Sequence, residues 1–152
     1  MVFGQFITTT QFYLYGRKHF TKTGWEIANK QYKQPDILED QSLSLKGKVY
    51  IITGANTGIG KEITTYLASK GATSYMLCRN PNRANEAKDS IIKSTNNSNV
   101  YVLLGDCGLE RDIRRTFEEF LQNQREITGN DEVSLDGVIC NAGALMNERT
   151  VT

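Results

Sequence analysis

The segment Thr53-Gly-Ala-Asn-Thr-Gly-Ile-Gly60 decides the fold class, because it joins an apolar run to a helical pattern. The run before it, residues 48–53 (KVYIIT), is short and rich in β-branched side chains, which is typical of a buried strand. Residues 59–70 follow with apolar side chains on one helical face and end before Gly71. The sequence therefore predicts a strand, a glycine-rich turn and a helix in immediate succession.

The same alternation continues along the chain. A strand, a helix, a strand, a helix and a strand are predicted in turn over residues 73–79, 80–94, 100–104, 110–124 and 135–140. The helix over 110–124 is the clearest of them, with Ile113, Phe117 and Leu121 four residues apart and Phe120 beside them. Strands that alternate with helices indicate βαβ units and a parallel sheet. Residues 46–152 are therefore predicted as an α/β domain with four parallel strands.

The glycines of the opening segment fit a turn that holds a pyrophosphate. Gly54 permits the tight turn, Gly58 lets the backbone approach the phosphates, and Gly60 lets the helix pack closely on its strand. The amides and the positive dipole end of the following helix favour the anion. We assign six residues of the segment to cofactor binding: Gly54, Asn56, Thr57, Gly58, Ile59 and Gly60. A purely structural turn is the alternative.

A P-loop is the competing interpretation of the same glycines, because Lys61 follows Gly60. Its spacing does not fit, since five residues rather than four separate Gly54 from Gly60. Glu62 also stands where a Ser or Thr would hold magnesium. The segment is therefore not a nucleoside triphosphate loop.

The end of the second predicted strand distinguishes between two cofactors. NAD-binding sites place an Asp or Glu there to hold the ribose 2′-hydroxyl. Residues 74–82 (SYMLCRNPN) contain no acid, and Arg79 follows Cys78. A guanidinium beside an uncharged residue suits a 2′-phosphate, so we expect NADP(H) in preference to NAD(H), with Arg83 as a second contact. The alternative is that Arg79 is a solvated surface charge.

Together these residues resemble the short-chain dehydrogenase/reductase superfamily. Its glycine motif TGxxxGxG appears as Thr53–Gly60, and its NNAG motif as Cys140-Asn-Ala-Gly143, with Cys140 in place of the first Asn. The resemblance implies that residues 46–152 are the N-terminal half of a Rossmann dinucleotide-binding domain, truncated after the fourth parallel strand. It implies that Asp106, after the third strand, contacts the adenine. It also implies that the cofactor site includes Asn141, Ala142 and Gly143. The implied chemistry is hydride transfer between a nicotinamide and a small carbonyl or alcohol substrate.

The catalytic groups that the resemblance implies are a Ser and a Tyr-x-x-x-Lys pair, which follow the NAG motif. The sequence ends eleven residues after Asn141. We therefore assign no catalytic residue and expect this chain alone to be inactive. A non-catalytic dinucleotide-binding protein is the alternative. Ending at Thr152 would also leave residues 137–140 as an apolar sheet edge.

Residues 1–33 have a different composition. They hold eight of the fourteen aromatic residues and five Lys or Arg, against the single acid Glu26. Such a basic, aromatic-rich helical segment either lies at a bilayer interface or packs on the domain or on a partner. Residues 34–46 are predicted as a linker, so residues 1–45 form a helical extension. A narrower resemblance, to the dehydrogenase/reductase member-twelve type among retinol-dehydrogenase-like enzymes, includes residues 16–32.

Composition and charge limit the remaining classes. The chain has 152 residues, 39% hydrophobic and 23% charged, as an ordinary globular domain does. A net charge of +1 gives no reason to bind nucleic acid. Cys78, Cys107 and Cys140 form no CxxC pair, and His19 is the only histidine, so we expect no disulfide framework and no metal site. We expect a cytoplasmic protein, membrane-associated if residues 1–33 meet a bilayer; a homo-oligomer stays open.

Overall fold

This computed structural model describes residues 2–31, 40–129 and 131–143. The chain divides into two compact units, Met1–Ser42 and Leu43–Thr152. The predicted linker lies partly outside the described residues, because positions 34–39 fall in a gap between them. Positions 144–152 also lie outside them.

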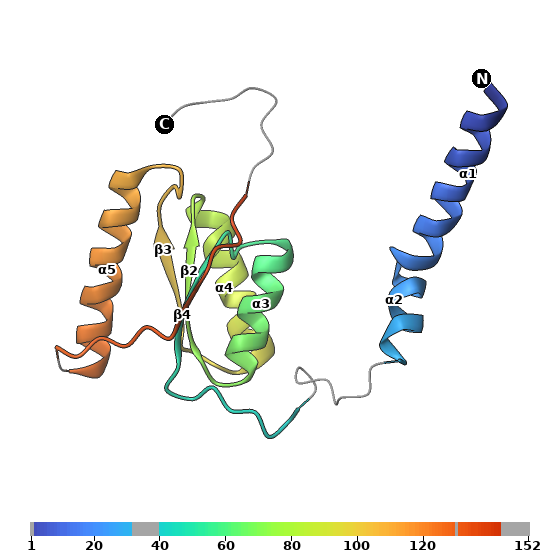
Figure 1. The fold of residues 1–152 in the computed structure, drawn as a ribbon. Coiled ribbons are helices and arrows are strands. Elements are labelled where there is room, and N and C mark those ends of the chain that lie inside the picture. The colour runs from blue at the N-terminus through green and yellow to red at the C-terminus, as the bar shows by residue number, and fades with distance from the viewer. Residues whose placement is uncertain (1, 32–39, 130, 144–152) are drawn as a thin grey trace. The chain divides into compact units, whose positions relative to one another are not determined.

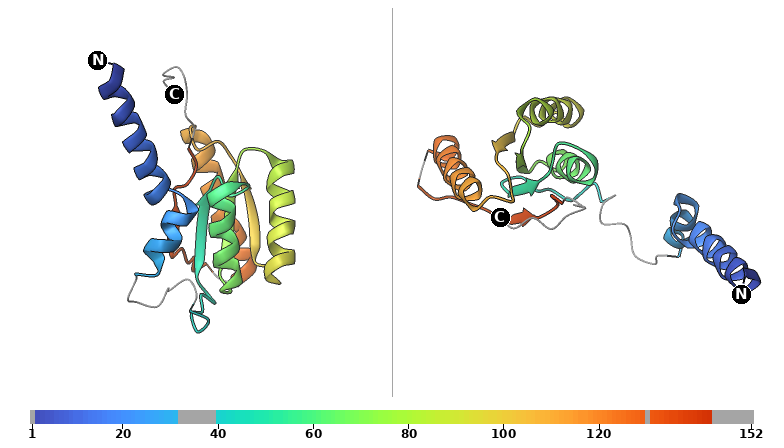
Figure 2. Two further views of the ribbon diagram at one scale, coloured as in Figure 1. Left: turned by 90° about the vertical axis from the view of Figure 1, so that its right-hand side faces the viewer. Right: turned by 90° about the horizontal axis from the view of Figure 1, so that it is seen from above.

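The second unit is a parallel β-sheet with helices on both faces (Figure 1). Its strands are β1 (Val49–Thr53), β2 (Thr73–Cys78), β3 (Val100–Leu104) and β4 (Gly137–Ile139), in the spatial order β3-β2-β1-β4. Its helices are α3 (Gly58–Ser69), α4 (Pro81–Thr95) and α5 (Glu110–Thr128). Helices α3 and α4 cover one face of the sheet and α5 covers the other (Figures 1 and 2). The predicted α/β fold is confirmed.

Two apolar cores lie on the two faces of this sheet, because successive side chains of a strand point in opposite directions. Ile52 of β1 and Met76 of β2 are fully buried in the core beneath α3 and α4. Their neighbours Ile51 and Tyr75 belong to the other core, which Phe120 of α5 completes. The rings of Tyr75 and Phe120 meet edge to face, with centroids 4.9 Å apart.

The apolar stripe that predicts α5 is not its most buried face. Ile113 and Phe117 remain 38% and 47% exposed. The buried positions of α5 are Thr116, Phe120 and Gln124. Thr116 and Phe120 each precede a residue of the predicted stripe by one position. Gln124 is buried because its Nε2 donates a hydrogen bond to the Tyr75 hydroxyl at 2.8 Å. The helix also continues four residues beyond its predicted end at 124.

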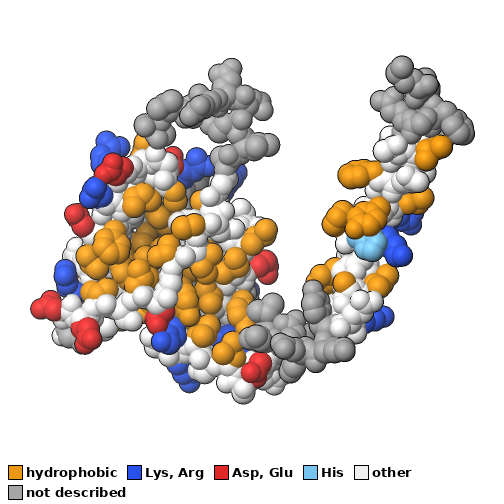
Figure 3. All heavy atoms as spheres, viewed as in Figure 1, with side chains coloured by type: hydrophobic (Ala, Val, Ile, Leu, Met, Phe, Trp, Pro, Cys, Tyr) orange, Lys and Arg blue, Asp and Glu red, His pale blue; other side chains and the backbone are white. Residues whose placement is uncertain are grey.

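Strand β4 is shorter than predicted and forms an edge of the described sheet. Its only strand partner there is β1, with Val138 opposite Ile51. The Asp136 carboxylate fixes the start of this pair, because it accepts hydrogen bonds from the Val49 amide and from Lys48 Nζ, each at 2.8 Å. Figure 3 shows apolar side chains gathered over α5 and β4, and Val138 is among the exposed ones.

The first unit consists of α1 (Val2–His19) and α2 (Lys22–Asn29). Thr21 builds the corner between them: its Oγ1 accepts a hydrogen bond from the Gly24 amide at 3.4 Å and donates one to the Arg17 carbonyl at 2.7 Å. A side chain at Gly24 would collide with the Lys18 carbonyl, so only glycine allows this approach. None of the helices among the described residues is long and apolar enough to span a membrane.

Candidate functional site

A pocket of about 600 Å³ opens at the carboxyl ends of the parallel strands. Eight of the eleven residues predicted for the site line it, and Arg83 does too. The three that do not line it are Gly58, Ile59 and Gly60. This end of an open α/β sheet is where such folds bind ligands, at the crevice outside the strand ends.

The turn after β1 leaves its backbone accessible. Gly54 and Gly58 both have positive φ values, +65° and +54°, which residues with a side chain rarely adopt. A Cβ built on Gly54 would lie 3.1 Å from Ala142 Cα, whereas one on Gly58 would meet no atom within 4 Å. Gly54 thus permits a close approach of two chain segments, and Gly58 keeps open space above the backbone.

Helix α3 begins at Gly58 without a side-chain cap, since Thr57 makes no capping hydrogen bond. The first amides of a helix have no partner within it, and the positive end of its dipole adds to them. Ile59 is 73% exposed and lies outside the pocket lining. The start of α3 is therefore suited to an anion.

Gly60 is buried where α3 packs against the ends of β1 and β4. A Cβ there would lie 2.5 Å from both the Gly54 carbonyl oxygen and Asn141 Nδ2. Gly60 permits this close packing, as the sequence predicts, but it does not line the pocket, and its assignment to cofactor binding stays a prediction.

Thr53 and Asn141 connect the glycine turn to the end of β4. Asn141 Nδ2 donates hydrogen bonds to the carbonyls of Thr53 at 3.0 Å and Gly54 at 3.4 Å. In return, Thr53 Oγ1 accepts from the amides of Asn141 at 3.0 Å and Ala142 at 2.9 Å. Sequence reasoning missed Thr53 as a site residue, although it opens the glycine motif and could have been identified there.

The opposite end of the pocket carries the charged side chains. Arg79 Nη1 lies 3.8 Å from Asp106 Oδ2, and the Arg79 side chain is 71% exposed. An ion pair this exposed is weak, so Arg79 is free to bind another anion. Asn80 Oδ1 accepts a hydrogen bond from the Arg83 amide at 3.0 Å, which places Arg83 in the first turn of α4. Asp106 is the only carboxylate among the lining residues.

The loop that carries Asp106 is held by Asp112 of α5. The Asp106 amide donates to Asp112 Oδ2 at 3.0 Å, and Asp106 Oδ1 accepts from the Gly108 amide at 2.9 Å. The hydrogen bond from the Asp106 amide is the main cause that lowers the pKa of Asp112, and the charge of Arg115 adds to it. The sequence does not predict this role of Asp112, because it depends on how the loop at Asp106 folds against α5.

Two cysteines, Cys78 and Cys107, line the pocket. Burial raises the pKa of Cys78, and burial with the nearby Asp106 charge raises the pKa of Cys107. Cys78, Cys107 and Cys140 are all free. Across the described residues, no group of three or more His, Cys, Asp or Glu is placed to hold a metal ion.

The parallel sheet, its strand order and the glycine turn that opens α3 define an α/β protein of the Rossmann type. Residues 48–151 match the profile of the short chain dehydrogenase family. The chain belongs to this family, which confirms the resemblance seen in the sequence.

Two relatives show how far the similarity extends. The chain is 34% identical to dehydrogenase/reductase SDR family member 12 of Bos taurus over 137 residues, which is 90% of this chain and 39% of that protein. It is 40% identical to retinol dehydrogenase 12 of Homo sapiens over 105 residues, 69% of this chain and 31% of that protein. The chain thus spans about two fifths or less of these relatives.

Solved structures show the same likeness. L-sorbose reductase from Gluconobacter frateurii, complexed with NADPH and L-sorbose, aligns with a TM-score of 0.56 and 26% identity over 70% of this chain and 37% of that chain. The N-domain of a bacterial malonyl-CoA reductase, solved with NADP, aligns with a TM-score of 0.56 and 31% identity over 66% of this chain and 17% of that chain.

Proposed function

We propose that the pocket binds NADP(H), and that the whole protein is an oxidoreductase that transfers hydride between this cofactor and a carbonyl or alcohol substrate. One observation carries the proposal. The lining of one pocket combines the left-handed Gly54 and Thr57, the residue before the uncapped start of α3, with two arginines and only one carboxylate.

The glycine turn fits the pyrophosphate of such a cofactor. Gly58 leaves open space above the backbone, and the first amides of α3 supply donors with a favourable dipole. Asn56 and Thr57, which directly precede Gly58, line the pocket and add polar groups. The hydrogen bonds between Thr53 and Asn141 hold the glycine turn in place. The backbone amides of the turn are therefore in position before the ligand binds.

The end of β2 fits a phosphorylated ribose better than an unmodified one. Cys78 stands where an NAD site has a carboxylate, and burial raises the pKa of its thiol, so it stays uncharged. Arg79 and Arg83 line the pocket just beyond it. Two guanidinium groups without a carboxylate at the strand end favour a 2′-phosphate. Asp106, opposite Arg79, would then meet the adenine side of the ligand.

When bound, NADP(H) supplies or accepts the hydride at its nicotinamide ring. The residues of this chain bind and orient the cofactor, and we assign none of them a catalytic role. The observation that L-sorbose reductase was solved with NADPH supports the cofactor. The proposed substrate class rests on the family alone. The chain spans only part of the length of its relatives.

The test is the binding of NADPH and NADH to the chain and to R79Q and R83Q, measured by calorimetry. A hydrogen bond to a charged group contributes about 1.5–3 kcal/mol, so each variant should bind NADPH about 10-fold to 150-fold more weakly. NADH affinity should stay unchanged, because NADH lacks the 2′-phosphate.

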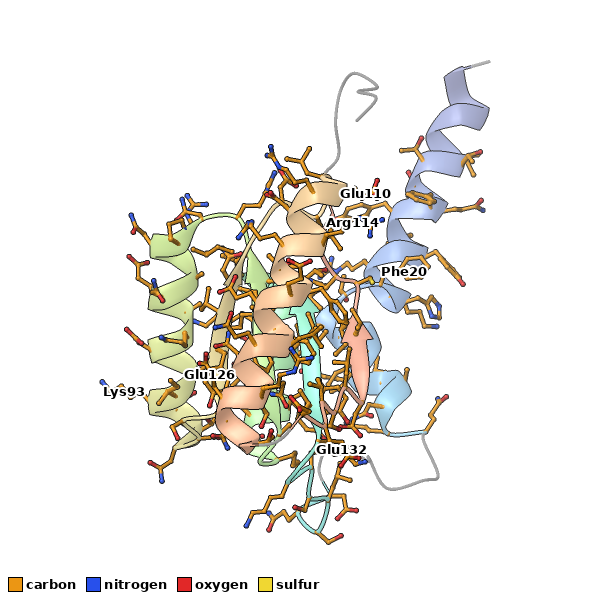
Figure 4. All side chains as sticks on the ribbon, turned by 90° about the vertical axis from the view of Figure 1, so that its left-hand side faces the viewer. Phe20, Lys93, Glu110, Arg114, Glu126 and Glu132 are labelled. Atoms are coloured by element: carbon orange, nitrogen blue, oxygen red, sulfur yellow. The ribbon has the colours of Figure 1, made fainter. Side chains whose placement is uncertain are left out.

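R114Q is the matched control, since Arg114 pairs with Glu110 on α5 and lies outside this pocket (Figure 4). It should bind both cofactors as the unmodified chain does. Equal losses for NADPH and NADH in R79Q would contradict the role of Arg79, and tighter binding of NADH by the unmodified chain would contradict the choice of cofactor.

A further inference from the structure

Arg79 and Asp106 follow two neighbouring strands at the same level of the sheet. Strands β2 and β3 run parallel with Cys78 opposite Leu104, and the Gly105 amide donates a hydrogen bond to the Cys78 carbonyl at 3.0 Å. Each of the two charged residues comes one position after this contact. The register of the two strands therefore brings the guanidinium and the carboxylate together at the edge of the pocket, with Arg79 Nη1 3.8 Å from Asp106 Oδ2.

The two partners of this ion pair are held to different degrees. The Asp106 amide donates to Asp112 Oδ2, and Asp106 Oδ1 accepts from the Gly108 amide, so its backbone and side chain are both fixed. The second carboxylate oxygen, Oδ2, is the one that faces Arg79. The Arg79 side chain is 71% exposed, and within the described residues Asp106 is its only ion-pair partner. The guanidinium can therefore change partners while the carboxylate stays in place.

A phosphate at this edge of the pocket would compete with the Asp106 carboxylate for Arg79. The proposed function brings the 2′-phosphate of the cofactor to Arg79 and Arg83, which both line the pocket. A guanidinium binds phosphate through hydrogen bonds of about 2.7–2.9 Å, and the 3.8 Å contact with Asp106 is longer than these. Arg83 takes no part in the pair with Asp106, so it provides an internal comparison.

We propose, on the basis of the proposed function, that Asp106 sets how strongly the pocket selects a 2′-phosphate, because it holds Arg79 while that phosphate is absent. When the phosphate binds, the Arg79 guanidinium leaves Asp106 Oδ2, and the lost ion pair reduces the affinity for the phosphorylated ligand. A ligand without the 2′-phosphate leaves the pair intact. Asp106 is thus a specificity-determining residue, and this role is separate from the adenine contact that the family resemblance implies for it.

The experiment compares the affinities of the full chain for adenosine 2′,5′-bisphosphate and 5′-AMP, measured by calorimetry. These ligands differ only in the 2′-phosphate, so a contact of Asp106 with the adenine cancels in the ratio of the two affinities. D106N keeps an oxygen that can accept from the Gly108 amide and removes the charge that holds Arg79. Exposed ion pairs contribute little free energy, so the preference for the bisphosphate should rise about twofold to fivefold in D106N.

Two further backgrounds separate this role from direct repulsion between the Asp106 carboxylate and the phosphate. In R79Q no guanidinium is left for Asp106 to hold, so D106N should lose most of its effect there. In R83Q, D106N should raise the preference as it does in the unmodified chain. D89N is the matched control, because Asp89 is an exposed carboxylate of α4 outside the pocket lining, and it should leave the preference unchanged.

A second measurement observes the ion pair itself. The NMR signal of the Arg79 Nε group, assigned by its absence in R79Q, should shift when adenosine 2′,5′-bisphosphate binds and shift far less with 5′-AMP. D106N should shift the same signal in the ligand-free chain, because the guanidinium loses its partner there.

The role of Asp106 would be overturned, with the proposed cofactor intact, by a preference for the bisphosphate that D106N leaves unchanged or lowers. A rise that is equally large in the R79Q background would also overturn it, since repulsion alone would then explain the effect. An Arg79 signal that D106N does not move would show that the pair does not form in solution. Equal binding of the two ligands to the unmodified chain would instead contradict the proposed function, and the role of Asp106 with it.

Discussion

Gly60 shows how one missing side chain positions several parts of the site. It lies where α3, the glycine turn and Asn141 meet, and a Cβ would come within 2.5 Å of atoms from the latter two. The hydrogen bonds of Asn141 to the carbonyls of Thr53 and Gly54 depend on the same approach. Packing at this position therefore determines the shape of the turn.

We expect G60A to lower the free energy of unfolding by about 1–3 kcal/mol, because an added methyl group in a closely packed site forces neighbouring atoms apart. Urea unfolding of the ligand-free chain measures this. G143A is the control, since a Cβ on Gly143 meets no atom of the described residues within 4 Å, and it should change stability by less than about 0.5 kcal/mol. Equal stability of G60A and G143A would contradict the packing role.

At the scale of the element, α5 is stabilised by the residues that contact the sheet. Phe120 is fully buried against Tyr75, whereas Phe117 is 47% exposed. We expect F120A to cost about 3–5 kcal/mol, as large-to-small changes of buried aromatics do, and F117A less than half of that. Thermal or urea unfolding of both variants checks the order. A larger loss in F117A would mean that α5 packs differently on the sheet.

The pairing of β1 with β4 should depend on pH through Asp136. Its hydrogen bonds from Lys48 and the Val49 amide lower the pKa of Asp136 below the ordinary 3.8. The ionised Asp136 carboxylate therefore stabilises the fold above pH 3.8. This contribution disappears as the pH falls through the lowered pKa of Asp136. The pKa of Lys48 is raised by the same partner, so its contribution is present below pH 10.5 and is lost as the pH rises through the raised value.

We therefore expect D136N to be less stable than the unmodified chain between pH 5 and pH 9, with the difference shrinking below pH 3.8. Urea midpoints measured across this pH range test it. D131N, at a fully exposed carboxylate, is the control and should show no such convergence. If the difference in urea midpoint between D136N and the unmodified chain is the same at pH 2 as at neutral pH, the role assigned to Asp136 is contradicted.

Most elements could be predicted from the sequence because their signals are local. The β-branched run of β1 and the Asn80-Pro81 start of α4 lie within a few residues of what they determine. Other features depend on distant partners. Gln124 is buried because Tyr75, 49 positions away, accepts its hydrogen bond, and Thr53 meets Asn141 across 88 positions. The sequence predicted the glycine turn, but not these partners.

At the scale of the whole molecule, every lining residue of the pocket belongs to the unit Leu43–Thr152, at the strand ends. The glycine turn is at one side and Arg79 and Arg83 are at the other.

With NADP(H) as the cofactor, the adenine and phosphate part of NADPH should account for most of the affinity. We therefore expect 2′,5′-ADP to compete with NADPH and to bind more tightly than 5′-ADP, measured by calorimetry. Equal binding of the two nucleotides would mean that the 2′-phosphate has no partner here.

The most direct test of NADP(H) binding at this pocket is an NMR titration of the isotopically labelled chain with NADPH. We predict that the largest amide shifts fall within residues 54–60, 79–83, 105–108 and 141–143, and that shifts are small along the exposed face of α5. The result that would contradict the account is saturating NADPH without shifts in these segments, or with its main shifts elsewhere in the chain.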